Sequence, residues 1–142
     1  MTDKPDKDYK LKQKLYEVLE LSNKYFEHFL PKNDRVVEYL KSRGLTGETI
    51  KEWRIGFAPA GWRNLKDFLI SRKYEESEIE KAGLIKKNEK GDSYDRFRSR
   101  IIFPINNSDG KPVGFTGRIF EGKDDEAKYL NSPETLLFDK SN

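Results

Sequence analysis

The chain has 142 residues, with 28 Lys and Arg against 25 Asp and Glu, one His and no Cys. The lack of Cys excludes a disulfide framework, a thiolate zinc site and a cysteine nucleophile, and a single His excludes a multi-histidine metal centre. No apolar run approaches 18 residues and the first ten residues are charged, so we expect no membrane span, no secretory signal and a cytoplasmic location. The aromatic share of 13% is above that of disordered chains, which predicts one folded domain.

The first half of the chain predicts helices. Residues 1–10 have mixed charge and are expected to form a flexible tail. Apolar residues then recur at helical spacing over residues 11–30, and Pro31 ends this first helix. Shorter helices are predicted within residues 33–44, 46–53, 62–69 and 77–82, with Asn33 and Thr46 as the predicted N-caps of the first two.

After Gly83 the pattern changes to short apolar runs separated by turn residues. These runs are Leu84–Ile85, Ser93–Tyr94, Ile101–Ile105 and, after a hairpin-type loop, Val113–Ile119. Helices followed by strands predict an α+β fold, with N-terminal helices followed by a small antiparallel β-sheet.

Arg96, Arg98 and Arg100 alternate along a stretch in which basic residues outnumber acidic ones. If this stretch is extended, all three guanidinium groups project from one face, and each can bind a phosphate through two hydrogen bonds. The alternative is structural, a salt-bridged sheet face with Asp92 and Asp95 as partners. The spacing alone favours the structural alternative.

Arg118 lies on the face of its strand opposite to the apolar residues and follows Gly114 and Gly117. Two glycines in a strand indicate the close approach of another backbone, a crowded core or a ligand, and spacing alone does not separate these. Trp53 and Trp62 could stack on bases, but their positions in the predicted helices favour the core.

These sequence patterns do not predict a set of catalytic residues that lie close together. The consecutive carboxylates Asp124, Asp125 and Glu126 point in different directions, which favours a solvated loop over a metal site. Ser and Asp are plentiful, but the single His has no evident partner for a catalytic triad. The residues by themselves therefore predict weak polyanion binding and nothing more specific.

Several ordered motifs carry a family resemblance. They are Tyr39–Leu45 (YLKSRGL), Ile55–Trp62 (IGFAPAGW), Tyr94–Ile105 (YDRFRSRIIFPI), Gly114–Arg118 (GFTGR), Lys128–Thr135 (KYLNSPET) and Leu137–Lys140 (LFDK). In these motifs the chain resembles bacterial DnaG-type DNA primases, over about residues 15–140. The matching part of that family is the N-terminal subdomain of the RNA-polymerase core, which we assign to residues 11–142.

The resemblance implies that a basic wall contacts the template, the primer hybrid or nucleotide phosphates. By motif, its residues are Arg43, Arg118, Lys128 and Lys140, with Tyr129 and Asn131 as weaker candidates. The chain departs from the family at Thr116, where Gly is common, and this difference would tighten the strand or shift Arg118 slightly.

The resemblance also implies synthesis of short RNA primers on single-stranded DNA by metal-assisted nucleotidyl transfer. The implied partners are the DNA template, an RNA–DNA hybrid, ribonucleoside triphosphates and, through another domain, the replicative helicase. Mg or Mn is expected in a TOPRIM domain and Zn in a Cys/His domain, both of which the family places outside this segment. We therefore expect no catalytic residue and no cofactor in this chain, which should be monomeric and inactive alone.

One other function remains open at this point. The chain could be a protein–protein docking module without nucleic-acid binding of its own, in which residues 11–30 contact a partner. A metal-dependent nuclease would need a carboxylate cluster that the sequence does not supply.

Overall fold

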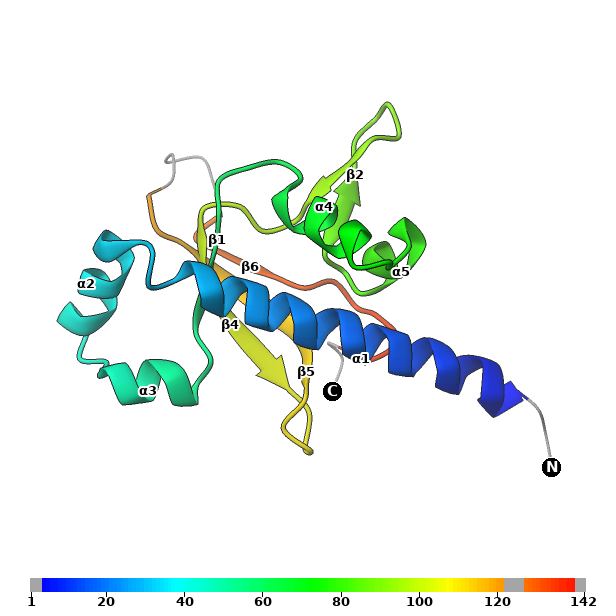
Figure 1. The fold of residues 1–142 in the computed structure, drawn as a ribbon, viewed down its shortest axis with the longest axis horizontal. Coiled ribbons are helices and arrows are strands. Elements are labelled where there is room, and N and C mark those ends of the chain that lie inside the picture. Colours follow the sequence, from blue (N-terminus) through cyan, green and yellow to red (C-terminus); the bar gives the residue numbers. More distant parts are fainter. Residues whose placement is uncertain (1–3, 122–126, 140–142) are drawn as a thin grey trace.

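The computed structural model describes residues 4–121 and 127–139. The helices are α1 (Lys4–Phe29), α2 (Asp34–Ser42), α3 (Gly47–Glu52), α4 (Asn64–Ser71) and α5 (Glu76–Lys81). The strands are β1 (Gly56–Ala58), β2 (Ile85–Lys87), β3 (Ser93–Asp95), β4 (Arg100–Asn106), β5 (Pro112–Ile119) and β6 (Tyr129–Asn131). Figure 1 shows α1 crossing in front of the strands, with α2 and α3 at one end and α4 and α5 near the other.

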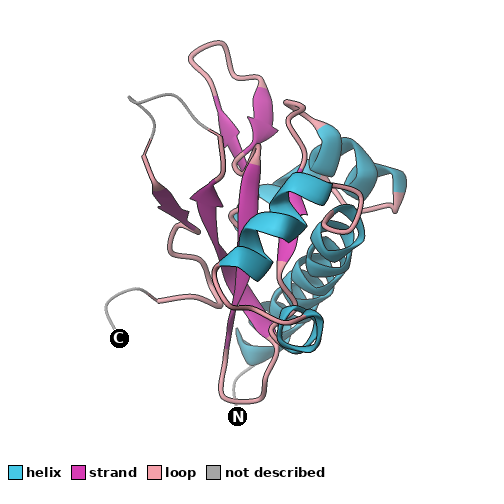
Figure 2. Cartoon of the chain, turned by 90° about the vertical axis from the view of Figure 1, so that its left-hand side faces the viewer, coloured by secondary structure: helices cyan, strands magenta, loops and turns pink. Residues whose placement is uncertain are grey.

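Four strands form an antiparallel sheet in the order β1-β4-β5-β6, and β2 and β3 form a separate hairpin. The predicted α+β class, with helices before a small antiparallel sheet, is confirmed. β1 and β6 are strands that the sequence analysis did not predict. Figure 2 shows the helices gathered mainly on one side of the strands, which leaves much of the other side uncovered.

Helix α1 begins at Lys4, so residues 4–10 form its first turns instead of the expected flexible tail. A proline near the start, Pro5, is compatible with this because the first N–H groups of a helix have no intrahelical partner. Further along, the apolar stripe that includes Leu15, Leu19 and Phe26 is fully or almost fully buried. The face that could have docked a partner protein is therefore used inside the domain. None of the described helices has the length and apolar character needed to cross a bilayer.

The sheet lies very close to α1. A Cβ atom on Gly56 would come 2.5 Å from the backbone carbonyl carbon of Phe26. A Cβ on Gly117 would come 2.8 Å from the ring of Phe97 and 3.1 Å from Arg100 Cδ. The glycine before Arg118 is therefore explained by crowding on the α1 side of the sheet, not by a ligand.

Helices α2 and α3 form a second cluster against the other face of the sheet, at the β1 end. Its buried members are Leu30, Val36, Leu40, Ile50, Ile55 and Ile101. Both predicted caps are present, because Asn33 Oδ1 accepts from the N–H of Val36 and Thr46 Oγ1 accepts from the N–H of Thr49. These caps satisfy helix N–H groups that would otherwise lack partners, and they fix where α2 and α3 begin.

Helix α4 begins at Asn64, two residues later than predicted, and a distant side chain fixes its start. Asp95 is 3% exposed, and its carboxylate accepts from the N–H groups of Leu65 at 2.8 Å and Lys66 at 3.0 Å. Burial raises the pKa of Asp95 to about 6, although the two N–H groups favour its charged form. This contact ties the end of β3 to α4.

Candidate nucleic-acid interface

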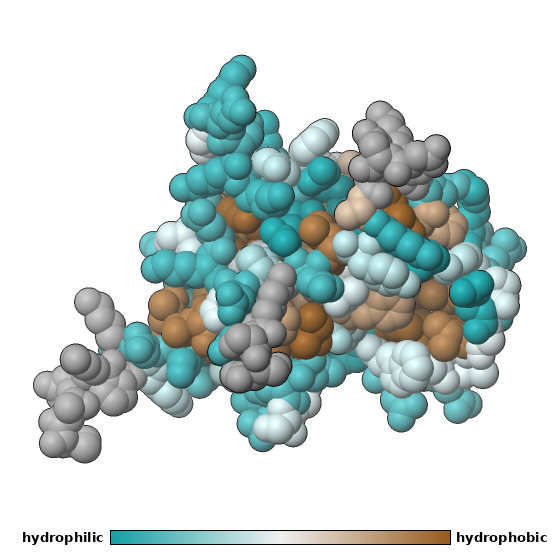
Figure 3. All heavy atoms as spheres, turned by 180° about the vertical axis from the view of Figure 1, so that it is seen from behind, coloured by the Kyte–Doolittle hydropathy of each residue, from teal (hydrophilic) through white to brown (hydrophobic). Residues whose placement is uncertain are grey.

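One row of side chains crosses all four strands on the face turned away from α1. Phe57, Ile101, Arg118 and Tyr129 are register partners across β1, β4, β5 and β6. The first two pack into the cluster under α2 and α3, whereas Arg118 is half-buried and Tyr129 is exposed. Figure 3 shows this side of the molecule, where apolar side chains remain visible between hydrophilic ones. The sheet thus presents a partly open surface that carries Arg118.

Arg118 lies between two tyrosine rings. Its guanidinium carbon is 5.2 Å from the ring centroid of Tyr39, on α2, and 5.9 Å from that of Tyr129. The guanidinium carbon of Arg43 is 6.0 Å from the Tyr39 ring, and Lys128 Nζ is 6.0 Å from the Tyr129 ring. We call these five residues the Arg118 cluster. Cations over aromatic faces are held in place while their remaining N–H groups stay available to a ligand.

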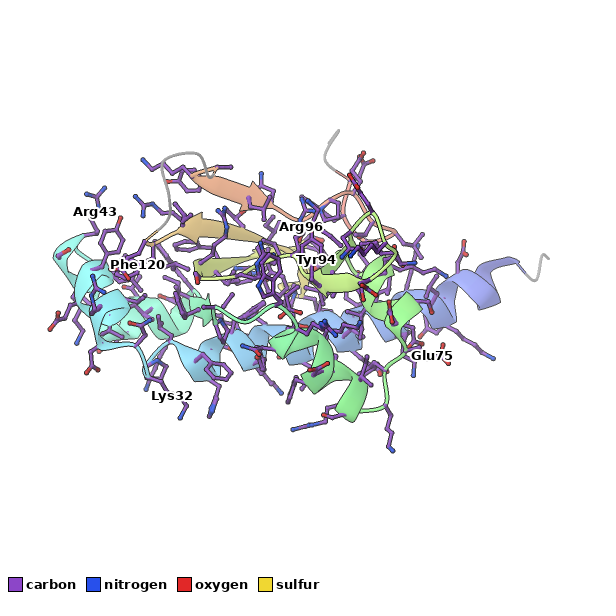
Figure 4. The ribbon with its side chains drawn as sticks, turned by 90° about the horizontal axis from the view of Figure 1, so that it is seen from above. Lys32, Arg43, Glu75, Tyr94, Arg96 and Phe120 are labelled. Carbon is purple, nitrogen blue, oxygen red and sulfur yellow. The ribbon has the colours of Figure 1, made fainter. Side chains whose placement is uncertain are left out.

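The cluster combines positive charge with an accessible ring. Arg43 and Lys128 are exposed, and Tyr129 is 54% exposed. Arg118 Nη1 donates to the carbonyl of Ile119 at 3.2 Å. Within residues 4–121 and 127–139, none of the three cations forms an ion pair with a carboxylate. Figure 4 shows Arg43 at the α2 end of the molecule.

Of the six site residues inferred from the motifs, the structure brings four together in the Arg118 cluster: Arg43, Arg118, Lys128 and Tyr129. Asn131 lies further along the same face, where its Oδ1 accepts from Thr116 Oγ1 at 2.9 Å. Its side-chain oxygen is therefore already used between strands. Lys140 lies outside the described residues.

The row of Arg96, Arg98 and Arg100 does not exist as expected. Only Arg100 lies in a strand, and Ser99, with φ of 53°, turns the chain so that the three side chains separate. These arginines have the structural role favoured above, but the hydrogen bonds that give them this role go to backbone carbonyl groups and not to the carboxylates of Asp92 and Asp95. Segment 96–100 therefore offers no continuous row of guanidinium groups to a polyanion.

Two of these arginines hold β6 in place. Arg96 donates from Nε and Nη2 to the carbonyl of Asn131, at 3.0 and 2.7 Å. Arg100 is 6% exposed and donates to the carbonyls of Gly117 at 3.0 Å and Ala127 at 2.9 Å. Buried carbonyls need donors, and a guanidinium group supplies up to five. These contacts fix the backbone next to Lys128 and Tyr129.

Arg98 contributes to a second exposed aromatic group, which the sequence analysis placed in the core. Trp62 is 61% exposed. The guanidinium carbon of Arg98 is 4.1 Å from the centroid of the Trp62 ring, and the centroid of the Tyr94 ring is 5.5 Å away. Trp53, the other tryptophan assigned to the core, is 54% exposed. A signal was present for Trp62, because it directly follows a Pro and Gly chain break and precedes the apolar face of α4.

The described residues do not fit a metal site. Among them, no group of three or more His, Cys, Asp or Glu side chains comes together. Asp124, Asp125 and Glu126 lie outside the described residues. We therefore derive no metal-dependent step from this chain.

The family model for the DNA primase catalytic core, N-terminal domain, matches residues 25–142. A DNA primase of Legionella pneumophila is 41% identical over 128 residues, which are 89% of this chain and 22% of that protein. The chain thus spans about a fifth of this curated relative.

Two solved structures share the fold. The RNA polymerase domain of Mycobacterium tuberculosis primase DnaG, in complex with a double-stranded DNA oligomer with a 6-nucleotide overhang, has a TM-score of 0.82 and 34% identity over 91% of this chain and 41% of that one. A DnaG primase catalytic domain bound to ssDNA has a TM-score of 0.83 and 36% identity over 93% of this chain and 43% of that one. The chain belongs to the family of DNA primase catalytic core N-terminal domains.

Proposed function

We propose that this chain is the nucleic-acid-facing part of a primase that makes short RNA primers on single-stranded DNA. The observation that carries the proposal is the Arg118 cluster, in which three cations without carboxylate partners among the described residues surround two tyrosine rings. Cations that follow a phosphate backbone, together with rings that stack on bases, are the two requirements for binding single strands without sequence preference.

In this proposal the chain binds and orients the strand. Arg43, Arg118 and Lys128 neutralise phosphates, and Tyr129 offers a ring face to a base. Trp62, with Arg98 stacked on it, supplies a second platform for an unpaired strand. A strand that contacts both platforms would run across the domain. Two solved relatives with this fold contain DNA, which supports DNA as the ligand.

The chemical step is assigned outside the described residues. Nucleotidyl transfer of this kind uses carboxylate-held metal ions to position the attacking and leaving oxygens. We propose that Mg or Mn is held by a TOPRIM domain, that Zn belongs to a separate Cys/His domain, and that the helicase is contacted through a further domain. The primer hybrid and ribonucleoside triphosphates would meet the Arg118 cluster from the cleft between domains. The isolated chain then binds a strand and makes no primer.

The test is a fluorescence-anisotropy titration of the chain with a labelled thymidine oligonucleotide at several salt concentrations. Arg118→Ala and Lys128→Ala should each weaken binding, and each should lower the magnitude of the log–log salt slope by about 0.7. Lys81→Ala is the matched control, because Lys81 is an exposed lysine on α5 and should leave both quantities unchanged.

Equal effects of all three substitutions would contradict the proposed interface, because they would show that any surface charge contributes alike. Binding that is insensitive to salt would contradict it too. A primer-synthesis assay with Mg or Mn completes the test. RNA product from the isolated chain would overturn the assignment of the chemical step to another domain.

A further inference from the structure

A pocket opens at the junction of α1, α2 and α3. Its volume is about 370 Å³, which is within the range of about 300–1,000 Å³ that is typical of ligand sites. Its apolar lining consists only of aliphatic side chains: Leu30, Pro31, Val37, Ile50 and Ile55. Three of these, Leu30, Ile50 and Ile55, are core residues that are at most 8% exposed, so the pocket reaches down to the second hydrophobic cluster.

Helix α2 separates this pocket from the Arg118 cluster. Val36 is buried in the middle, Tyr39 faces Arg118, and Val37 and Lys41 line the pocket. Side chains at positions 37 and 41 are one helical turn apart, on a different side of the helix from position 39. The pocket is therefore a second surface, distinct from the candidate nucleic-acid interface.

The rim of the pocket is positively charged. Lys41 and Lys51 line it, are exposed, and form no ion pair with any residue in the described ranges. The one lining carboxylate, Glu27, is already bound by Arg54, with Arg54 Nη2 2.9 Å from Glu27 Oε1. Figure 4 shows Lys32, next to the lining residue Pro31, on the α1 side of the molecule and opposite to Arg43.

We propose that this pocket binds a short segment of a partner protein in which a large apolar side chain is flanked by carboxylates. The apolar side chain would enter the aliphatic pocket, and the carboxylates would meet Lys41 and Lys51. Nucleic acid fits less well, because the apolar lining has no aromatic ring on which a base could stack. The inference does not depend on the proposed function, since it uses none of the residues of the Arg118 cluster.

The test is a titration of the nitrogen-15-labelled chain with the peptide Asp-Asp-Leu-Phe-Asp-Asp, followed by amide chemical shifts. We expect saturable shifts around Val37, Ile50 and Ile55. The charge-swapped peptide Lys-Lys-Leu-Phe-Lys-Lys and the apolar-deleted peptide Asp-Asp-Ser-Ser-Asp-Asp should each bind at least about tenfold more weakly.

Two kinds of variant sharpen this test. Lys41→Glu combined with Lys51→Glu should weaken binding about tenfold. The matched control is Lys86→Glu with Lys90→Glu, at the β2–β3 hairpin, which should leave binding unchanged. Gly47→Met should also abolish binding by occupying the mouth of the pocket. A Cβ at Gly47 meets nothing within 4 Å, so this variant is expected to fold.

Shifts confined to the pocket that the first double variant and Gly47→Met both reduce would support the proposal. It would be overturned if the peptide produced no saturable shifts, or if the serine peptide bound equally well. Shifts around Arg118 in place of the pocket, or an oligonucleotide that shifts the pocket amides, would overturn it as well. A change in sedimentation that shows self-association through this surface would also contradict it.

Discussion

The two faces of the four-stranded sheet are built for different purposes. On the α1 side, Gly56 and Gly117 allow neighbouring groups to approach so closely that a Cβ would clash. On the opposite side, Arg118 is half-buried beside Tyr39 of α2, and Tyr129 is exposed. Added volume on the first face should lower the stability of the domain most, because packed interiors tolerate it poorly. On the second face, the removal of a charge or a ring should lower ligand affinity most.

The same contrast separates two groups of arginines. Arg96 and Arg100 use their donors on backbone carbonyls, whereas Arg43 and Arg118 lie over tyrosine rings with donors left over. A guanidinium group can therefore hold a strand in place or present charge to a ligand, and its neighbours decide which. Substitutions on the α1 face should lower stability, and substitutions on the open face should lower affinity.

The largest expected effect is that of Gly56→Ala. The added Cβ would lie 2.5 Å from the Phe26 backbone, which cannot rotate away as a side chain could. We expect the free energy of unfolding to fall by about 3 kcal/mol. Urea denaturation measures it. Gly47→Ala is the control, because its Cβ meets nothing within 4 Å, and it should change stability by less than about 0.5 kcal/mol. Similar losses for both would mean that α1 does not press on the sheet.

The next effect is a dependence of stability on pH that comes from Asp95. Burial raises the pKa of this carboxyl from 3.8 to about 6 in the folded state, so the folded protein binds the proton more tightly than the unfolded chain does. Because of this shift, protonation of Asp95 stabilises the folded state. This stabilisation is complete below pH 3.8 and falls by about 3 kcal/mol as the pH rises to about 6. The free energies of unfolding of the wild type and Asp95→Asn, measured by urea denaturation, should therefore differ by an amount that changes between pH 4 and 6. Above pH 6 this difference should be constant.

A constant difference across that range would mean that the backbone N–H groups of Leu65 and Lys66 fully offset burial. In that case the pKa of Asp95, measured by carbon-13 NMR of its carboxyl, should be at or below the ordinary value. The two measurements together separate a weakened helix start from a change in protonation.

The third effect concerns affinity alone. Trp62→Ala removes the ring under Arg98 and should weaken binding of a thymidine oligonucleotide about tenfold, because stacking contributes about 1–3 kcal/mol per base. The salt slope should not change, in contrast to Arg118→Ala, because a ring neutralises no phosphate. Anisotropy titrations at several salt concentrations measure both quantities. Trp62→Phe serves as the control and should keep part of the affinity. A reduced slope for Trp62→Ala would indicate that its main role is to position Arg98.

Local signals predicted much of this fold. The 3.6-residue spacing identified α1, the caps Asn33 and Thr46 located α2 and α3, and alternation identified β5. The short strands β1 and β6 escaped prediction because each has only three residues, and β1 in addition pairs with a strand far away in the sequence, β4. The turn at Ser99 also gave no local warning, since a positive φ there depends on the surrounding structure.

The candidate site was predictable only through the resemblance to primases. Spacing pointed to Arg118, but nothing local indicated that Lys128 would lie beside it, since the pairing of β5 with β6 creates that proximity. Tyr39 belongs to one of the quoted motifs, yet its place between Arg43 and Arg118 depends on how α2 packs against the sheet. Trp62 was misplaced because apolar spacing cannot show that a ring lies outside the helix that follows it.

The smallest effect is expected at Thr116, where the chain departs from the family. Its hydroxyl donates to Asn131 Oδ1 at the rim of the open face. Thr116→Val keeps the branched shape and removes only this hydrogen bond, so stability should fall by about 0.5 kcal/mol, as measured by urea denaturation. Arg118 is held by the rings of Tyr39 and Tyr129 and not by Thr116, so the salt slope of oligonucleotide binding should be unchanged. A slope as low as that of Arg118→Ala would show instead that β6 must be bonded to β5 at this point for the cluster to form.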